Sequence, residues 1–346
     1  MEVNETSPVP NGENACIKCS SPQYEEGYQA KLCRECRQEL SRYPVKKSVV
    51  WAAIGVGILV IVSLYKFPSS FSAELSYERA VKLEKQHKYM SAEKELRKTL
   101  QLYPEYLAGS AHFMLAAFYN DRLLAADSAL EHWAGVSSKD NEELISQVND
   151  VLSARNYYFF EDSTFAVLYD SLGATPAAAK AALLEYTQAH PKDVLASFLL
   201  ANAYYSEADY ANTDKVCETL LKNAPDFHPV YSLLAASYRE QKKYDEATGI
   251  CNKLLRRNSE SVAGNISLIK ILLKQKQDQQ ALQRAQAIYA LAPDDPQVLA
   301  ALILVCHFNH RQKERDQLLA TLKQSADTSG LAATLDIIQG KITYRD

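Results

Sequence analysis

The pattern of hydrophobic and polar positions divides the chain into a polar start, one uncharged apolar stretch and a long helical remainder. Residues 1–15 show no hydrophobic periodicity, which predicts a disordered tail. Residues 48–65 contain no charged side chain and correspond to about 27 Å of helix, close to the ~30 Å hydrocarbon core of a bilayer. A buried core helix is the alternative, but a helix of that kind normally keeps a polar stripe. We therefore expect a transmembrane helix over 46–67 and a linker over 68–72.

The charges beside the apolar stretch predict its orientation. Several cations precede the stretch, whereas only Lys66 and Arg79 follow it closely. Because the cytoplasmic flanks of membrane helices are enriched in Lys and Arg, we expect a cytoplasmic N-terminus. The residues after the stretch would then be extracytoplasmic, and periplasmic if the protein is bacterial. The preceding cations are Lys31, Arg34, Arg37, Arg42, Lys46 and Lys47.

A period of 34 residues organises the rest of the chain. Small residues recur at this period, with one interval that is longer by 19 residues. Prolines share the register, since Pro191 and Pro225 are 34 residues apart and Pro225 and Pro293 are 68 apart. This period with helical patterning indicates stacked pairs of antiparallel helices, and hence an all-α fold. The small residues are Ala92, Ala126, Ala179, Thr213, Ala247 and Ala281.

Two stretches, 200–225 and 234–258, carry the clearest copies of the repeat. Each opens on Leu-Ala, continues to a Tyr and reaches a second Tyr after the turn. Both resemble the tetratricopeptide repeat (TPR) family, which implies a superhelical solenoid of A and B helices with small residues where the two helices cross. The matching residues are Leu200, Ala201, Tyr204 and Tyr210 in the first stretch, and Leu234, Ala235, Tyr238 and Tyr244 in the second.

The resemblance sets the expected boundaries of the repeat region. We predict a TPR array over 73–328 with about seven repeats, and an extra helix near 142–158 that accounts for the longer interval. Residues 329–346 would hold a capping helix and the end of the chain. The predicted repeats are 73–106, 107–140, 160–193, 194–227, 228–261, 262–295 and a less regular 296–329.

Four cysteines near the start of the chain form a separate motif over 16–40. They are Cys16, Cys19, Cys33 and Cys36, in the pattern CxxC, thirteen residues, CxxC. Two such knuckles can present four thiolates tetrahedrally to Zn²⁺, and the segment resembles zinc ribbons and zinc knuckles. We therefore predict one structural zinc ion. A redox dithiol, an iron site and two disulfides are the alternatives, and a second open question is whether the knuckle only folds its own segment or also recruits a partner.

The TPR resemblance also implies a binding groove lined by the A helices. Its lining positions correspond to Phe198, Asn202, Tyr205, Arg239, Lys270 and Lys274. Aromatic, amide and basic side chains together resemble a groove for an extended peptide or a helix. The two-carboxylate clamp of chaperone-binding TPRs is not reproduced, because Phe198 stands where that clamp has a basic residue. The alternative is that these residues are ordinary solvated surface.

Charge and motif content narrow the function further. The net charge is −4, from 38 basic and 42 acidic residues, so we expect no nucleic-acid partner. No catalytic motif is present, and we predict that the chain is not an enzyme. The leading hypothesis is a membrane-anchored scaffold that binds proteins or peptides, in envelope assembly, protein folding or complex assembly. The alternative is a zinc-dependent regulatory adaptor that couples a cytoplasmic partner to the TPR region; the partner, the pathway and the oligomeric state stay open.

Overall fold

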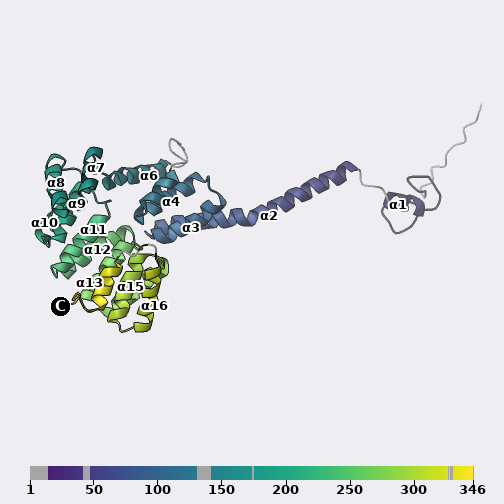
Figure 1. Cartoon of the computed structure of the whole chain (residues 1–346). Helices are drawn as coiled ribbons and strands as arrows, with labels where there is room; N and C mark the ends of the chain where they lie inside the picture. The colour runs from purple at the N-terminus through teal and green to yellow at the C-terminus, as the bar shows by residue number, and fades with distance from the viewer. Residues whose placement is uncertain are drawn as a thin grey trace, which may run out of the picture. The chain divides into compact units, whose positions relative to one another are not determined.

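The computed structural model describes residues 15–41, 47–130, 142–173, 175–325, 327 and 330–345. Every regular element in these ranges is a helix (Figure 1). The chain divides into two units, residues 1–68 and residues 69–346. The predicted disordered tail over 1–15 lies, apart from Ala15, outside the described residues.

The helices follow one another with short connections through most of the second unit. The first unit holds α1 (Arg34–Ser41), and α2 (Lys47–Glu84) begins there and continues into the second unit. The remaining helices are α3 (Tyr89–Leu102), α4 (Leu107–Tyr119), α5 (Leu123–Leu130), α6 (Glu142–Arg155), η2 (Asn156–Tyr158), α7 (Ser163–Leu172), α8 (Pro176–Ala189), α9 (Val194–Ser206), α10 (Tyr210–Asn223), α11 (Pro229–Glu240), α12 (Tyr244–Arg257), α13 (Val262–Lys274), α14 (Asp278–Leu291), α15 (Pro296–Phe308), α16 (Gln312–Gln324) and α17 (Leu331–Ile338).

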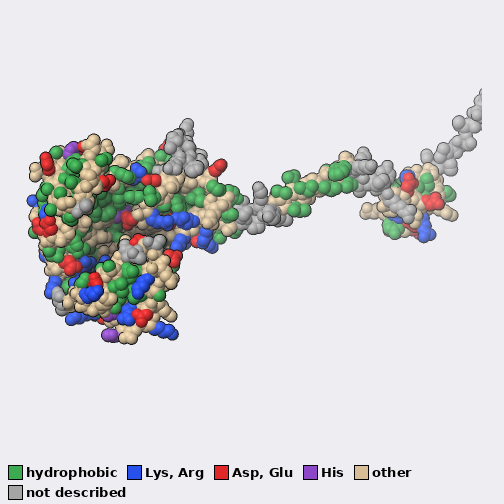
Figure 2. All heavy atoms as spheres, viewed as in Figure 1, with side chains coloured by type: hydrophobic (Ala, Val, Ile, Leu, Met, Phe, Trp, Pro, Cys, Tyr) green, Lys and Arg blue, Asp and Glu red, His purple; other side chains and the backbone are tan. Residues whose placement is uncertain are grey.

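Helix α2 corrects two sequence predictions. It runs without interruption through the predicted linker over 68–72, which is therefore helical. Beyond the apolar stretch the same helix carries the charged residues Glu74, Glu78 and Arg79. Figure 2 shows the apolar side chains along the first part of α2.

The described part of the chain contains no helix that is both long and apolar enough to cross a membrane. The predicted transmembrane helix over 46–67 is therefore wrong. The predicted localisation, a single-pass membrane protein with a cytoplasmic N-terminus and extracytoplasmic repeats, is wrong with it.

The second unit consists of helices that pack on their neighbours in sequence. We call the end of α2 together with α4, α7, α9, α11, α13 and α15 the A helices, and α3, α5, α8, α10, α12, α14 and α16 the B helices. Each B helix packs on the A helix before it or after it, for example α12 on both α11 and α13. The A helices α9, α11, α13 and α15 also contact one another in order. Successive A helices therefore share one surface of the array.

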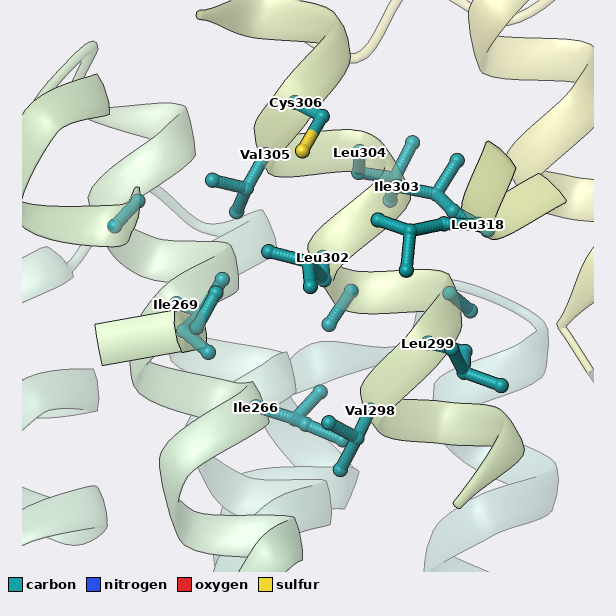
Figure 3. Close-up of a cluster of buried hydrophobic side chains, with 14 of the residues drawn as sticks. Ile266, Ile269, Val298, Leu299, Leu302, Ile303, Leu304, Val305, Cys306 and Leu318 are labelled. Atoms are coloured by element: carbon teal, nitrogen blue, oxygen red, sulfur yellow. The ribbon is translucent and has the colours of Figure 1, made fainter. Parts of the chain in front are cut away.

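The small residues of the 34-residue register lie in the core. Ala92, Thr213, Ala247 and Ala281 are each 0% exposed, and Ala126 and Ala179 are also buried. A methyl group or hydroxyl at these points lets two helices approach closely, and larger side chains beside them fill the grooves. Figure 3 shows this packing where Ile266 and Ile269 of α13 face Val298 and Leu302 of α15.

The turns repeat with the same register as the helices. A residue other than glycine has a positive φ of 56° to 61° at His87, Asp121, Ala208, Lys242, Lys276 and His310. In the turn after α13, the amide of Gln277 donates to the carbonyl of Leu272 (2.9 Å), which is the hydrogen bond of a Schellman motif. On the other side of each pair, Pro104, Pro191, Pro225 and Pro293 all lie in the turn that follows a B helix, as their spacing predicts.

Helix α6 and the short η2 occupy the longer interval between the repeats. Helix α6 packs against α4, and its residues belong to the same core cluster as α3 and α4. Tyr158 of η2 lies between the early and the later repeats, since its ring is 6.2 Å from that of Phe118 and 4.8 Å from that of Phe227. The insertion therefore joins the core of the first two repeats to the core of the later ones.

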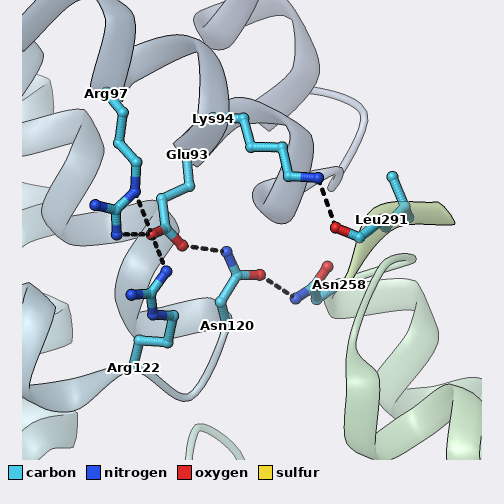
Figure 4. A network of polar contacts seen from close by, with 7 residues as sticks. All are labelled: Glu93, Lys94, Arg97, Asn120, Arg122, Asn258 and Leu291. Atoms are coloured by element: carbon cyan, nitrogen blue, oxygen red, sulfur yellow. Dashed lines mark hydrogen bonds and ion pairs between the residues drawn. The ribbon is translucent and has the colours of Figure 1, made fainter. Parts of the chain in front are cut away.

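A network of polar contacts links the first two repeats directly to turns of the later repeats (Figure 4). The buried carboxylate of Glu93 accepts hydrogen bonds from Asn120 (2.9 Å) and Arg122 (2.6 Å). The Asn258 amide donates to the Asn120 side chain (3.1 Å) and to the Tyr119 carbonyl (2.7 Å). We call the clasp the set formed by these residues and the pair Ser91 and Glu260.

A second pair completes the clasp. The hydroxyl of Ser91 donates to the carboxylate of Glu260 (2.6 Å), which also accepts from the Ser91 amide (2.8 Å). These residues are 169 positions apart in the sequence. The repeat array therefore folds back so that α3 meets the turn after α12.

Candidate functional site

The four cysteines of the first unit come together in the structure. The thiol sulfurs of Cys16, Cys19, Cys33 and Cys36 all lie within 4.8 Å of one another. The Cys19 and Cys33 sulfurs are 3.6 Å apart, and none of the four forms a disulfide. Four sulfurs at about 2.3 Å from one tetrahedral ion would be separated by about 3.8 Å, so the arrangement fits a metal ion. The 3.6 Å between Cys19 and Cys33 is close to that value and longer than the ~2.05 Å of a disulfide.

Local backbone geometry holds the cysteines in this arrangement. The first knuckle turns at Ser20, whose φ is +58°, and its amide donates to the Cys16 carbonyl (2.8 Å). In the second knuckle the Cys36 amide points to the Cys33 sulfur (3.4 Å) at the start of α1. Amides directed at sulfur stabilise the thiolate form that metal binding requires. Cys16 and Cys36 are buried, which makes the cluster the core of its small unit.

The cations near the cysteines are paired with carboxylates of the same unit. Lys18 forms an ion pair with Glu39 (2.8 Å), and Arg37 forms one with Glu25 (2.8 Å). Arg37 also lies 3.7 Å above the ring of Tyr28. These contacts tie the loop between the two knuckles to α1, and so they contribute to the folding of the segment around its cysteines.

The other three cysteines are core residues. Cys217, Cys251 and Cys306 are free and at most 1% exposed, and each lies within a hydrophobic cluster of the repeats. Burial raises the pKa of each thiol to about 12. A thiol that stays neutral is a poor nucleophile and a poor metal ligand, so these cysteines act as small apolar side chains.

Most of the predicted groove residues lie on the shared surface of the A helices. Tyr205 is on α9, Arg239 on α11, and Lys270 and Lys274 on α13. Arg239 pairs with Glu240 (2.8 Å), and Lys274 lies 3.6 Å from the same carboxylate. The structure therefore gathers one aromatic and three basic residues from three successive A helices. We call these four residues the A-helix surface.

The remaining two groove residues have different surroundings. The Phe198 ring lies 5.1 Å from that of Phe227 and packs against the core of the later repeats. Phe198 is therefore a partly exposed packing residue, at the position where the chaperone-binding clamp has a basic residue. Asn202 is exposed on α9, and one turn of helix separates it from Tyr205. It therefore extends the same helix face.

Burial and neighbouring charges shift the pKa values on the A-helix surface. Burial raises the pKa of Tyr205, and the charge of Arg239 opposes that shift. Burial lowers the pKa of Lys270, and the Arg239 guanidinium lowers it further. Crowding of like charges in a partly buried place favours an electron-rich group nearby, such as a carbonyl, a carboxylate or an aromatic face.

Such a group comes from a segment that sequence analysis assigned only to the cap. Residues 341–345 follow α17 without regular structure, and the Tyr344 hydroxyl donates to the backbone carbonyl of Lys270 (3.4 Å). The Lys274 ammonium lies 5.0 Å from the centre of the Tyr344 ring. The signal in the sequence was Gly340, whose φ of +72° ends the helix and redirects the chain.

Comparison with known families identifies the repeats. A tetratricopeptide repeat family model matches residues 238–302, from the end of α11 into α15. Residues 238–302 therefore carry tetratricopeptide repeats, in agreement with the 34-residue register. Among curated protein sequences no relative of this chain is found. The family evidence does not extend to the cysteine motif.

Several solved structures are similar to parts of the chain. MamA AMB-1 is 20% identical with a TM-score of 0.33, over 49% of this chain and 92% of the other. The pilF protein of Pseudomonas aeruginosa is 14% identical with a TM-score of 0.32, over 71% and 99%. Cut9 in its complex with Hcn1 is 15% identical with a TM-score of 0.43, over 78% and 64%. The family model, and not these distant likenesses, carries the assignment of the repeats.

Proposed function

We propose that the chain is a protein-binding scaffold whose A-helix surface binds an extended peptide segment of a partner protein. The observation that carries this proposal is the gathering of Tyr205, Arg239, Lys270 and Lys274 from three successive A helices beside an extended segment of the same chain. Extended peptides bind through backbone hydrogen bonds and a few anchoring side chains, and this surface offers both kinds of contact.

The composition of the surface supports a peptide partner over a nucleic acid or a metabolite. The three cations are partly neutralised by Glu240, so the local charge is modest. Nucleic-acid binding needs a row of cations that neutralises successive phosphates. Figure 2 shows both acidic and basic side chains on the visible face of the repeat unit.

Affinity capture with the full chain tests the proposal. The double variant Arg239→Gln/Lys270→Gln removes two charges from the A-helix surface with little change in side-chain size. Its matched control, Lys215→Gln/Lys222→Gln, removes two charges from exposed positions on the B helix α10. We expect proteins captured from an extract of the source cells to fall at least tenfold with the first variant and to be unchanged with the second. Equal capture by both variants would remove the A-helix surface as the binding site.

We also propose that Cys16, Cys19, Cys33 and Cys36 hold one structural Zn²⁺. The sulfur separations and the four-thiolate set support zinc, whose structural sites are closed tetrahedra of this kind. Bound zinc would supply a fixed link between the two knuckles and would need no other core in so short a segment. The regulatory adaptor with zinc as its switch gains no observation in its favour.

Metal analysis of the purified full chain tests the zinc site. We expect about one zinc per chain, falling to near zero in the variant Cys36→Ser. The control Cys217→Ala removes a thiol outside the cluster and should leave the zinc content unchanged. Iron in place of zinc, or metal that survives Cys36→Ser, would contradict the proposal.

A further inference from the structure

Residues 341–345 form a short segment after α17 that lies against α13, α14 and α15. The segment begins where Gly340 ends α17, and residues 343–345 have no regular secondary structure. The side chains of Lys341, Ile342 and Thr343 are exposed, whereas those of Tyr344 and Arg345 are partly buried. Two consecutive residues therefore hold the segment in place.

Tyr344 is surrounded by the residues of the A-helix surface. Its hydroxyl donates to the Lys270 carbonyl at 3.4 Å, and the Lys274 ammonium faces its ring at 5.0 Å. On the other side its ring lies 5.7 Å from the ring of Phe308 on α15. The contacts combine an aromatic anchor, a cation beside its ring and one backbone acceptor.

Arg345 is held by a separate set of residues. Its guanidinium forms two hydrogen bonds to the Asp278 carboxylate, one of them 3.1 Å long. It also lies 3.8 Å from the centre of the Phe308 ring. A guanidinium that pairs with a carboxylate and stacks on an aromatic ring is selective for arginine over lysine. The side chain of Arg345 is only 16% exposed, so water screens this pair less than an open surface pair.

Two neighbouring residues, one aromatic and one arginine, contact side chains or backbone of three helices, α13, α14 and α15. The preceding residues contact α17 instead, where Lys341 pairs with Asp336 (3.2 Å). Because the anchors are few and the segment carries no helix of its own, a peptide with the same two side chains can replace it without unfolding the repeats.

We propose that residues 341–345 are an intramolecular occupant of the partner-binding surface, and that this surface, extended by Asp278 and Phe308, recognises an aromatic residue followed by arginine in an extended segment of a partner protein. The inference rests on the proposed function of the A-helix surface. A tethered segment acts at an effective concentration on the order of millimolar, so it excludes partners unless they bind more tightly or the segment is released.

The probe for this proposal is a peptide of residues 340–345, capped at both ends and labelled with a fluorophore. Its binding is measured by fluorescence anisotropy to the full chain and to the double variant Tyr344→Ala/Arg345→Ala. We expect the variant to bind at least tenfold more tightly, because its surface is vacant. A matched control, Ile342→Ala/Thr343→Ala, alters exposed positions of the same segment and should bind like the unaltered chain.

Variants of the peptide and of the protein test each of the two anchoring contacts. Peptides carrying Tyr344→Ala or Arg345→Ala should lose at least tenfold in affinity for the vacant surface, and Asp278→Asn in the double variant should weaken the unaltered peptide to a similar extent. A chain that ends at Gly340 provides a second form of the vacant surface, and circular dichroism verifies that each variant keeps its helices. Equal affinity for the full chain and the double variant would overturn intramolecular occupancy. No binding to either form would overturn the recognition of the aromatic and arginine pair.

Peptide binding and partner capture test the two proposals separately. If the peptide fails to bind while Arg239→Gln/Lys270→Gln still reduces partner capture, the scaffold function stands and the role of residues 341–345 falls. If neither measurement responds, both proposals fall together.

Discussion

At the scale of single residues, each repeat position restricts either the size of the side chain or the backbone conformation. The small residues of the register are buried where helices cross. In the turn after several A helices, one residue other than glycine has a left-handed backbone, for example Lys276 after α13. A side chain in that conformation costs roughly 1–2 kcal/mol, because its Cβ approaches the following carbonyl. The Schellman hydrogen bonds and the next helix hold the turn in spite of this cost.

Replacing one of these residues with glycine should stabilise the protein. Lys276 has φ +59° and an exposed side chain at the end of α13. The variant Lys276→Gly relieves the left-handed strain but raises the entropy of the unfolded chain, so we expect a net gain of about 0.5–1 kcal/mol. Chemical denaturation measures the free energy of unfolding. Lys276→Ala keeps a Cβ and should give no gain; a loss of stability with Gly would contradict the strain.

At the scale of helices and turns, the sequence predicts the second unit better than the first. Helix pairs follow from a register repeated by two residue types, small residues and prolines, and each of these positions depends mostly on its immediate neighbours. Helix α2 illustrates the opposite case. Pro68 and the serines after it favour a break between 68 and 72, because proline lacks the amide donor of a helix interior, yet α2 continues through them.

Enlarging a small residue where two helices cross should destabilise the protein. Ala247 of α12 is 0% exposed, so Ala247→Leu forces α11 and α12 apart and should cost about 1–3 kcal/mol. The control Ala211→Leu enlarges an exposed position of α10 and should change stability by less than about 0.5 kcal/mol. Thermal and chemical denaturation of both variants measure the difference. Similar stabilities for the two variants would show that the crossing is not tightly packed.

At the scale of the whole repeat unit, two features depend on contacts between distant residues. The clasp joins residues 169 positions apart, and the Tyr344 hydroxyl reaches a carbonyl 74 positions away. Neither could be predicted from the register, which describes only what a repeat does to its neighbours. Of the six predicted groove residues, four lie together on three successive A helices. What the sequence missed there was the segment that occupies the surface.

The clasp should contribute measurably to the stability of the unit. Asn258 is 1% exposed and its amide donates to both Tyr119 and Asn120. Asn258→Ala removes both hydrogen bonds to these partly buried acceptors and should cost about 1–3 kcal/mol. Asn252→Ala, at an exposed position of α12, the helix that Asn258 follows directly, is the matched control. Denaturant unfolding compares the two, and limited proteolysis should show earlier cleavage near α3 in the first. Wild-type stability in Asn258→Ala would show that the clasp contributes nothing.

The most direct test of the central claim asks which face of the array a partner touches. A photo-crosslinking amino acid is placed in the full chain at Asn202 on the A helix α9, or at Lys215 on the B helix α10, both exposed. The partner captured by the unaltered chain is then crosslinked and the products are identified by mass spectrometry. We predict crosslinks from position 202 and none from position 215. Crosslinks from position 215 alone would contradict binding through the A helices.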